Sequence, residues 1–172
     1  MAEVERTLVV MRHAKAERVG PSDFERELSD RGYGDAAAAG AWLAEVGVQP
    51  DQALVSAAAR TEQTWQHASR GAGWAVAPTL DEGLYAADVD TALDLVRALD
   101  DAATSVVVVG HNPTMAYLAQ LLDDGEGNED AANEMAVGTF PTSATAVFTL
   151  TGPWRDIGAS RATLTAYHVG RR

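Results

Sequence analysis

The sequence predicts a single α/β domain over residues 1–172, a three-layer α/β/α sandwich in which helices cover both faces of a mainly parallel sheet. Short apolar runs that are typical of buried strands alternate with segments whose apolar residues recur at helical spacing. This alternation is typical of strand–helix–strand units, whose strands run parallel. A chain of 172 residues is also long enough to bury a sizeable core in one compact domain.

The first half of the chain provides three expected strands and two expected helices. The strands are expected over 7–11 (TLVVM), 52–56 (QALVS) and 74–77 (WAVA). One helix is expected over 29–46, because Ser29 is a suitable N-cap and a glycine follows the last periodic residue. The second helix is expected over 61–69.

The second half continues the alternation. A helix is expected over 90–101, followed by a strand over 105–109 (SVVVV) whose unbroken β-branched run indicates burial on both faces, in the middle of the sheet. Another helix begins at Asn112-Pro113. The remaining elements are an acidic loop over 123–133 and two strands over 145–150 and 161–167.

The composition excludes several classes of protein. The chain has no cysteine, so it has no disulfide, thiolate metal site or cysteine nucleophile. Its formal net charge of -12 disfavours nucleic acid and anionic membranes as partners. The first residues do not resemble a signal peptide, and no segment reaches the roughly 20 apolar residues of a membrane span. We therefore expect a soluble, cytoplasmic protein, and no His/Asp/Glu spacing predicts a metal site or a cofactor.

Two histidines directly follow the two clearest strands: His13 comes after 7–11 and His111 after 105–109. In open α/β sheets, ligands bind outside the carboxyl ends of the strands, so both imidazoles are expected at the same edge. A lone histidine after a strand is more often structural, but an arginine beside one and a helix N-terminus after the other favour a functional site. His67 and His168 are expected to be structural.

Arg12 and Arg60 are the candidate anion-binding residues. Arg60 follows the strand over 52–56, at the start of a helix and again on the carboxyl side of the sheet. Arginine matches phosphate oxygens through paired, planar donors, and two arginines beside a helix N-terminus form a pocket for a dianion. The alternative for Arg60 is a cap or a salt bridge on the surface.

At these residues the chain resembles a known family, the histidine phosphatase superfamily. The segments that carry the resemblance are Arg12-His13-Ala14, similar to its Arg-His-Gly signature; Leu28-Ser29-x-x-Gly32; 56–64 (SAAARTEQT), similar to Ser-Pro-x-x-Arg-x-x-Gln-Thr; and Gly110-His111-Asn112. They occur in the family's order, and the match spans roughly residues 7 to 122. The short chain and the RHAKAE wording are most similar to the SixA-type phosphohistidine phosphatase branch. Ala14 and Ala57 depart from the family's glycine and proline, and neither position carries a reacting atom.

The resemblance implies a role for each candidate residue. His13 would attack phosphorus and form a transient phosphohistidine, while Arg12, Arg60 and His111 would hold the phosphate oxygens, with Asn112 as a further substrate-binding residue. Phosphoryl transfer gains most from positioning and charge stabilisation, which these groups supply without a metal. The proton donor is expected to be Glu82, from its "Leu-x-Glu" setting, with the adjacent Asp81 as the alternative.

The substrate is expected to be a phosphorylated molecule, and the sequence favours a phosphohistidine protein. Only the 38 residues 14–51 separate His13 from the next strand, and they already contain a helix, so little chain is left to cover the site. An open site suits a phosphorylated protein side chain better than an enclosed metabolite. The alternatives are a broad phosphatase for small phosphoesters or nucleotides, and a phosphate-binding module without turnover. The motifs do not indicate the oligomeric state.

Overall fold

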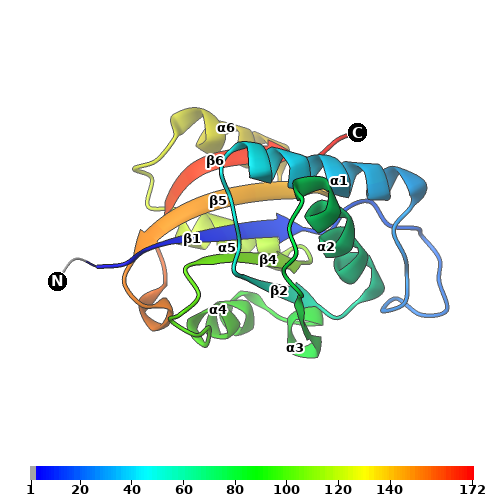
Figure 1. The fold of residues 1–172 in the computed structure, drawn as a ribbon, viewed down its shortest axis with the longest axis horizontal. Helices are drawn as coiled ribbons and strands as arrows, with labels where there is room; N and C mark the ends of the chain where they lie inside the picture. Colours follow the sequence, from blue (N-terminus) through cyan, green and yellow to red (C-terminus); the bar gives the residue numbers. More distant parts are fainter. Residues whose placement is uncertain (1–2) are drawn as a thin grey trace.

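The computed structural model describes residues 3–172, so the first two residues of the domain predicted over 1–172 lie outside it. Strands and helices alternate through most of the chain (Figure 1). The strands are β1 (Glu5–Arg12), β2 (Gln52–Ser56), β3 (Thr79–Asp81), β4 (Ser105–Gly110), β5 (Ala144–Thr151) and β6 (Thr163–Val169). The helices are α1 (Asp30–Glu45), α2 (Ala59–Ala72), α3 (Glu82–Tyr85), α4 (Val89–Arg97), α5 (Thr114–Leu122), α6 (Glu129–Gly138) and the 3₁₀ helix η1 (Trp154–Asp156).

The strands form one sheet in the order β3-β2-β4-β1-β5-β6. Neighbouring strands run parallel from β3 to β1, whereas β5 is antiparallel to both of its neighbours, β1 and β6. The sheet is therefore mainly parallel, as predicted. β4 lies between β2 and β1, so the prediction that its valine run occupies the middle of the sheet is confirmed. In Figure 1 the arrows of β1, β2 and β4 point toward the same end of the molecule.

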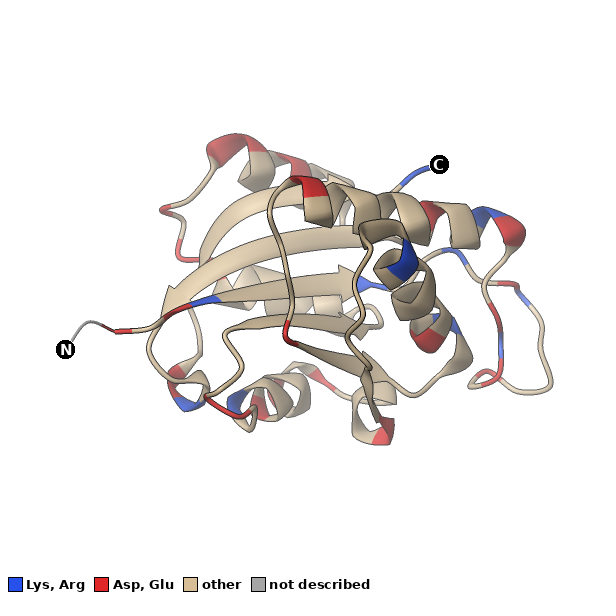
Figure 2. Cartoon of the chain, in the orientation of Figure 1, with Lys and Arg blue, Asp and Glu red and all other residues tan. Residues whose placement is uncertain are grey.

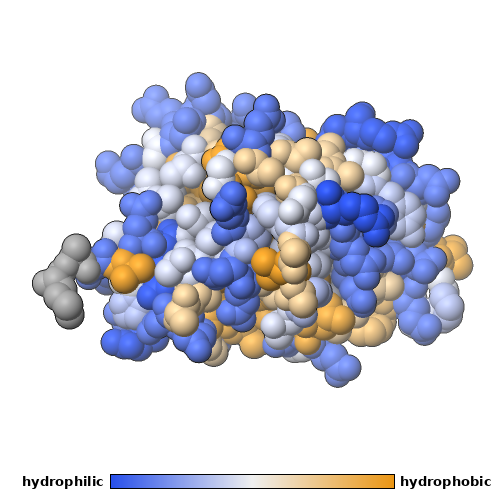
Figure 3. All heavy atoms as spheres, viewed as in Figure 1, coloured by the Kyte–Doolittle hydropathy of each residue, from blue (hydrophilic) through white to orange (hydrophobic). Residues whose placement is uncertain are grey.

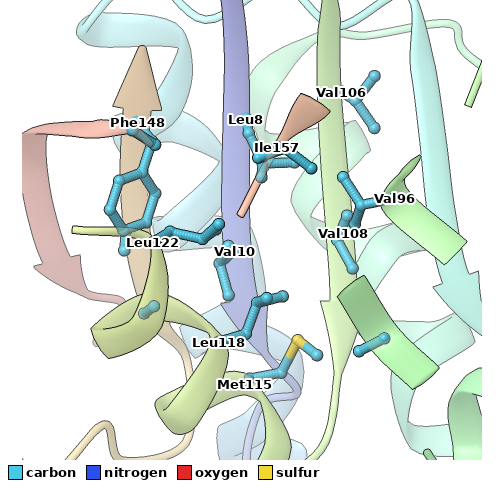
Figure 4. Close-up of a cluster of buried hydrophobic side chains, with 14 of the residues drawn as sticks. Leu8, Val10, Val96, Val106, Val108, Met115, Leu118, Leu122, Phe148 and Ile157 are labelled. Atoms are coloured by element: carbon cyan, nitrogen blue, oxygen red, sulfur yellow. The ribbon is translucent and has the colours of Figure 1, made fainter. Parts of the chain in front are cut away.

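Helices cover both faces of the sheet and give the three layers expected from the sequence. On one face, side chains of α1 and α2 pack over a core that includes Val9 and Val107. On the other face, α4, α5 and α6 cover a larger core that includes Val10 and Val108. Figure 4 shows Leu118 of α5 lying against Val10 of β1. Successive residues of a strand thus enter different layers, as the two-residue period of a strand requires.

The register of the two central strands brings their carboxyl ends level. Arg12, the last residue of β1, pairs with Gly110, the last residue of β4, so the residues that follow both strands emerge together. β2 ends at Ser56 beside β4, and Ser56 pairs with Asp81 at the end of β3. Four segments that carry candidate residues therefore meet at one edge of the sheet.

The third strand is displaced from its expected position over 74–77 to Thr79–Asp81. Gly73 ends α2 in a left-handed conformation with φ of 77°, which turns the chain back along the helix. Trp74 then donates its indole N–H to the carbonyl of Val48 at 3.2 Å. The apolar residues after Gly73 thus pack beside the helices. The next strand, β3, begins at Thr79, five residues later than expected.

Helix bounds also differ from those expected. α2 begins at Ala59 rather than at 61, and α4 ends at Arg97 rather than at 101. The segment 123–133, expected to be a loop throughout, contains the start of α6. The side chain of Asn128 caps α6 by accepting the backbone N–H of Ala131 at 2.9 Å. Apolar residues of α6 reach the larger core, and this burial makes helical a segment whose acidic composition indicated a loop.

Charged residues lie mainly on helices and loops around the sheet, and the strands carry charge mainly at their ends (Figure 2). The face shown in Figure 3 is largely hydrophilic, with hydrophobic atoms in separate groups among polar ones. Within residues 3–172, no helix combines the length and the apolar composition that crossing a membrane requires.

Candidate active site

His13 and His111 lie side by side at the carboxyl edge of the sheet. The backbone N–H of His13 donates to the carbonyl of Gly110 at 3.0 Å, so the residue after β1 continues the pairing of β1 with β4. The two imidazole rings have centroids 5.5 Å apart and are inclined by 55° to each other. Only 8% of the His13 surface is exposed. The structure thus brings together two histidines that are far apart in sequence.

Backbone contacts fix the His13 ring in one orientation. Its Nδ1 lies 2.7 Å from the carbonyl oxygen of Ala14, so Nδ1 carries the proton and donates it to that acceptor. The Ala14 N–H donates to the hydroxyl of Thr64 at 2.9 Å. The Ser143 N–H donates to the His13 carbonyl at 3.0 Å, and the Gly170 N–H donates to the Ser143 carbonyl at 3.1 Å. The neutral ring therefore keeps its lone pair on Nε2, which is available as a nucleophile.

Burial keeps both site histidines unprotonated at neutral pH. Desolvation is the largest cause that lowers the pKa of His13 to about 3, from an ordinary value of 6.5. The hydrogen bond to Ala14 raises this pKa, while the charges of His111 and the nearby arginines lower it. Desolvation also lowers the pKa of His111 to about 4. His13 is therefore neutral at neutral pH, and no base is needed to remove a proton from its Nε2.

The neutral burial of His13 predicts a loss of stability in acid. Folding lowers the pKa of His13, so the unfolded chain binds a proton at this histidine at a higher pH than the folded protein does. The stability that neutral His13 contributes is therefore fully present above pH 6.5. It is lost as the pH falls toward about 3. The loss is at most about 1.4 kcal/mol for each pH unit. We expect the free energy of unfolding of His13→Ala, measured by chemical denaturation, to fall less steeply below pH 6.5 than that of the unsubstituted protein. Parallel slopes would contradict a depressed pKa.

Two arginines lie beside the histidines. Arg12 ends β1 and donates from Nη1 to the carbonyl of Phe140 at 3.4 Å. Arg60, in the first turn of α2, is 6% exposed and forms an ion pair with Asp23 at 3.2 Å. Arg60 thus forms a salt bridge, as the alternative expected, but its own side chain is buried while that of Asp23 is about half exposed. Burial, and then the charge of Arg60, lower the pKa of Arg12, because the two guanidiniums are close enough to repel each other. Such a pair favours an anion between them.

Two oxygen atoms orient the groups that follow β4. His111 Nε2 lies 2.8 Å from the hydroxyl of Ser56 at the end of β2. The side-chain amide of Asn112 donates to the Phe140 carbonyl at 2.7 Å, and its oxygen accepts the N–H of Ala116 in α5 at 3.2 Å. Phe140 has φ of 58°, a left-handed conformation that is uncommon outside glycine and recurs at functional sites. Both ends of the Asn112 amide are thus engaged within the protein, which favours a positioning role for this residue.

Several buried nitrogen atoms of these residues have no hydrogen-bond partner in the protein. Among the buried side-chain polar atoms of residues 3–172, the unpartnered ones include Nε of Arg12, Nε of Arg60 and Nδ1 of His111. A buried polar group without a partner costs free energy, so a cluster of them requires an explanation. An anion with several acceptor oxygens would meet this need and would also offset the charge of the two guanidiniums.

Asp81 and Glu82 lie at the same edge of the sheet. Within the described part of the chain, neither carboxylate hydrogen-bonds to the two site histidines or to the two site arginines. Asp81, the last residue of β3, accepts the backbone N–H of Leu84 at 3.2 Å and so caps the short helix α3. Glu82 is exposed on the first turn of that helix. Asp81 therefore has a structural partner, whereas the side chain of Glu82 faces solvent.

Of the two other histidines, His67 lies on α2 and His168 lies on the edge strand β6. The ring of His67 is 4.5 Å from that of Tyr33, and the ring of His168 stacks on Trp42 at 4.9 Å. These aromatic contacts agree with the structural role expected for both.

Sequence reasoning missed Asp23 and Tyr85, which contact Arg60 and His111 directly. Asp23 lies in an irregular loop between β1 and α1, and its bonds to Arg60 and Tyr85 join residues far apart in sequence. No local period or motif marks such contacts. The clearest available signal was that Tyr85 lies close to Glu82, just after a strand. That strand was expected over 74–77, whereas it is formed by Thr79–Asp81.

Comparison with known proteins agrees with this geometry. The family model described as the histidine phosphatase superfamily (branch 1) matches residues 8–91. An uncharacterised protein of Mycobacterium leprae is 35% identical over 166 residues, which cover 94% of this chain and 100% of that protein. The structure of a provisionally assigned phosphohistidine phosphatase SixA from Nakamurella multipartitia is 32% identical, with a TM-score of 0.83 and 96% of each chain covered.

A structure of the protein histidine phosphatase SixA complexed with tungstate is 26% identical, with a TM-score of 0.75, and covers 95% of this chain and 96% of that one. The Mycobacterium leprae protein and the two SixA structures each match at least 94% of this chain. The chain therefore belongs to the histidine phosphatase superfamily, and it is similar along almost its full length to members of the SixA type.

Proposed function

We propose that the protein is a phosphatase that transfers a phosphoryl group from its substrate to Nε2 of His13 and then to water. The observation that carries the proposal is the free Nε2 of a buried, neutral His13 beside two arginines with unpartnered nitrogen atoms. Tungstate is a tetrahedral oxyanion like phosphate, and its presence in the SixA complex supports oxyanion binding by this chain.

The reaction has two steps. In the first, the Nε2 lone pair attacks phosphorus in line, and the bond from phosphorus to the leaving group breaks as the new P–N bond forms. Arg12, Arg60 and His111 hold the equatorial oxygens and stabilise their charge, and Asn112 positions the groups around them. In the second step, water attacks phosphorus and loses a proton, the P–N bond breaks, and inorganic phosphate leaves with His13 restored. Glu82 is the proposed donor of a proton to the leaving group.

The proposed substrate is a phosphohistidine side chain of another protein. The similarity to SixA structures supports this choice. The connections around the site also support it: between β1 and β2 the chain holds one loop and α1, and between β3 and β4 only α3 and α4. No inserted domain roofs the site within residues 3–172, so a side chain on a protein surface can approach it.

A substrate panel tests this proposal. The protein should release phosphate from a phosphohistidine protein with a higher kcat/KM than from phosphoserine peptide, small phosphoesters or nucleotides. The ratio of kcat/KM values is the measurement, because it compares transition states. A preference for small phosphoesters or nucleotides would indicate the broad phosphatase instead. Phosphate binding without release from any substrate, including an aryl phosphate, would indicate a binding module.

We also predict that the reaction is independent of metal ions, because two guanidiniums supply the positive charge that phosphoryl transfer requires. The rate of phosphate release, measured before and after dialysis against a chelator, should be unchanged. Vanadate and inorganic phosphate should inhibit competitively. A rate that collapses in chelator and returns on addition of a divalent cation would contradict the proposed role of the arginines.

A further inference from the structure

Asp23 binds the guanidinium of Arg60 through both its backbone and its side chain. Nη1 of Arg60 donates to the Asp23 carbonyl at 2.8 Å, and Nη2 donates to Asp23 Oδ2 at 3.2 Å. These bonds occupy the terminal nitrogens of the guanidinium. Nε remains without a partner, so the side edge of the group, formed by Nε and a remaining N–H of an Nη atom, is left for an anion.

Tyr85 holds the same carboxylate oxygen. Its hydroxyl donates to Asp23 Oδ2 at 2.5 Å, and the guanidinium of Arg60 lies over its ring at 5.9 Å from the centroid. The ring also meets His111 edge-on, with centroids 5.5 Å apart. Tyr85 therefore contacts Arg60 and His111, two of the proposed phosphate-binding residues. It also contacts Asp23, which binds Arg60.

Asp23 has no free carboxylate oxygen. Oδ1 accepts the Nε–H of Arg26 at 3.0 Å, and Oδ2 accepts from both Tyr85 and Arg60. The backbone next to it is fixed as well, because the Ala59 N–H at the start of α2 donates to the Phe24 carbonyl at 3.0 Å. The hydrogen bond from Tyr85 is the largest cause that lowers the pKa of Asp23 to about 2, so the residue is ionised and cannot donate a proton.

We propose that Asp23 and Tyr85 form a clamp that sets the orientation of Arg60 for the phosphoryl group, so that both are positioning residues of the reaction. This inference rests on the proposed function for the identity of the ligand. Arg12 and Arg60 repel each other, and the Asp23 carboxylate offsets that repulsion. A carboxylate near the site also repels a phosphate, but it reaches Arg60 only at the terminal nitrogens. It therefore orients the guanidinium without occupying the edge left for the anion.

The clamp can be tested with Asp23→Asn, Tyr85→Phe and the double variant. Matched controls are Asp94→Asn, which removes an ion pair of the same 3.2 Å length with Arg97 on α4, and Tyr117→Phe, which alters an exposed tyrosine of α5. The readouts are the affinity for inorganic phosphate by titration calorimetry, kcat and KM with an aryl phosphate, and the melting temperature. Asp23 is exposed enough for solvent to weaken its contribution to stability, so the melting temperature should change little.

Asp23→Asn should weaken phosphate binding about tenfold, the loss typical of a hydrogen bond to a charged group, and kcat/KM should fall at least as much. The double variant should bind phosphate no more weakly than Asp23→Asn, because Tyr85 acts through Asp23. In an Arg60→Ala background, Asp23→Asn should have no further effect. Both control variants should match the unsubstituted protein.

Three results would overturn the clamp. Tighter phosphate binding by Asp23→Asn would show that Asp23 competes with phosphate for Arg60. A lowered melting temperature with unchanged phosphate affinity would show a structural role alone. A loss that persists in the Arg60→Ala background would show that Asp23 does not act through Arg60. If phosphate binding responds as expected but no substrate turns over, the clamp stands and the proposed function fails.

Discussion

Replacing His13 with alanine should abolish phosphate release while leaving the fold intact. Nε2 of His13 is the proposed nucleophile. Among the described histidines, only His13 has one ring nitrogen bonded to a backbone carbonyl, the other ring nitrogen free, and two arginines beside it. Removing a nucleophile lowers kcat by at least about 10⁴-fold in enzymes that form covalent intermediates. The measurements are kcat and kcat/KM for phosphate release, with circular dichroism to confirm the fold.

The covalent intermediate gives a second, independent measurement. Rapid quenching with labelled substrate should trap a label that is labile in acid, stable in alkali and located on His13, as expected for a phosphohistidine. His168→Ala is the matched control, because it removes a histidine whose ring stacks on Trp42, and it should label normally. Full activity in the His13→Ala variant would remove the whole mechanism.

Glu82→Gln should slow hydrolysis of an alkyl phosphate by roughly 10²–10⁴-fold, the usual effect of losing an assisted proton transfer. The same substitution should have much less effect on a phosphohistidine substrate. In that case the first step exchanges one imidazole–phosphorus bond for another, and an imidazole needs less help to leave than an alkoxide. The measurement is the ratio of the two losses in kcat/KM.

The neighbouring carboxylate supplies the control. Asp81→Asn keeps an oxygen that can accept the N–H of Leu84, so it changes the charge while keeping the cap of α3. It should affect both substrates equally and weakly. A selective loss in Asp81→Asn but not in Glu82→Gln would mean that Asp81 is the donor. Equal losses on both substrates in Glu82→Gln would mean that Glu82 serves binding or structure.

The sequence was most informative where a strand ends. His13 and His111 could be placed at one edge because both follow long apolar runs, and parallel strands with helical crossovers bring their carboxyl ends together. Arg60 could be placed there for the same reason. The expected strand over 74–77 was wrong because apolar residues can be buried against helices as well as in a sheet. Composition alone does not separate the two.

The contacts that complete the site could not be predicted, since they depend on long-range packing. The Phe140 carbonyl reaches Arg12 and Asn112 because the chain takes a left-handed turn before β5. The two left-handed residues of that turn, Thr139 and Phe140, are not glycines, so the sequence does not mark it. Asp23 meets Arg60 from an irregular loop whose path is set by backbone bonds to α2. Side-chain partners of this kind follow from the assembled fold and not from periodicity.

The chain of backbone bonds from His13 to Ser143 and on to Gly170 has a practical consequence for protein engineering. The last residues of the chain lie two hydrogen bonds from the proposed nucleophile, and the Arg172 N–H docks on the Asp35 carboxylate of α1 at 3.0 Å. A tag joined after Arg172 would pull on this docked tail and, through it, on the backbone that holds the imidazole. Figure 1 shows the start of β1 at the opposite end of that strand from this edge. Purification handles, fluorescent reporters and immobilisation linkers therefore belong on the N-terminal side.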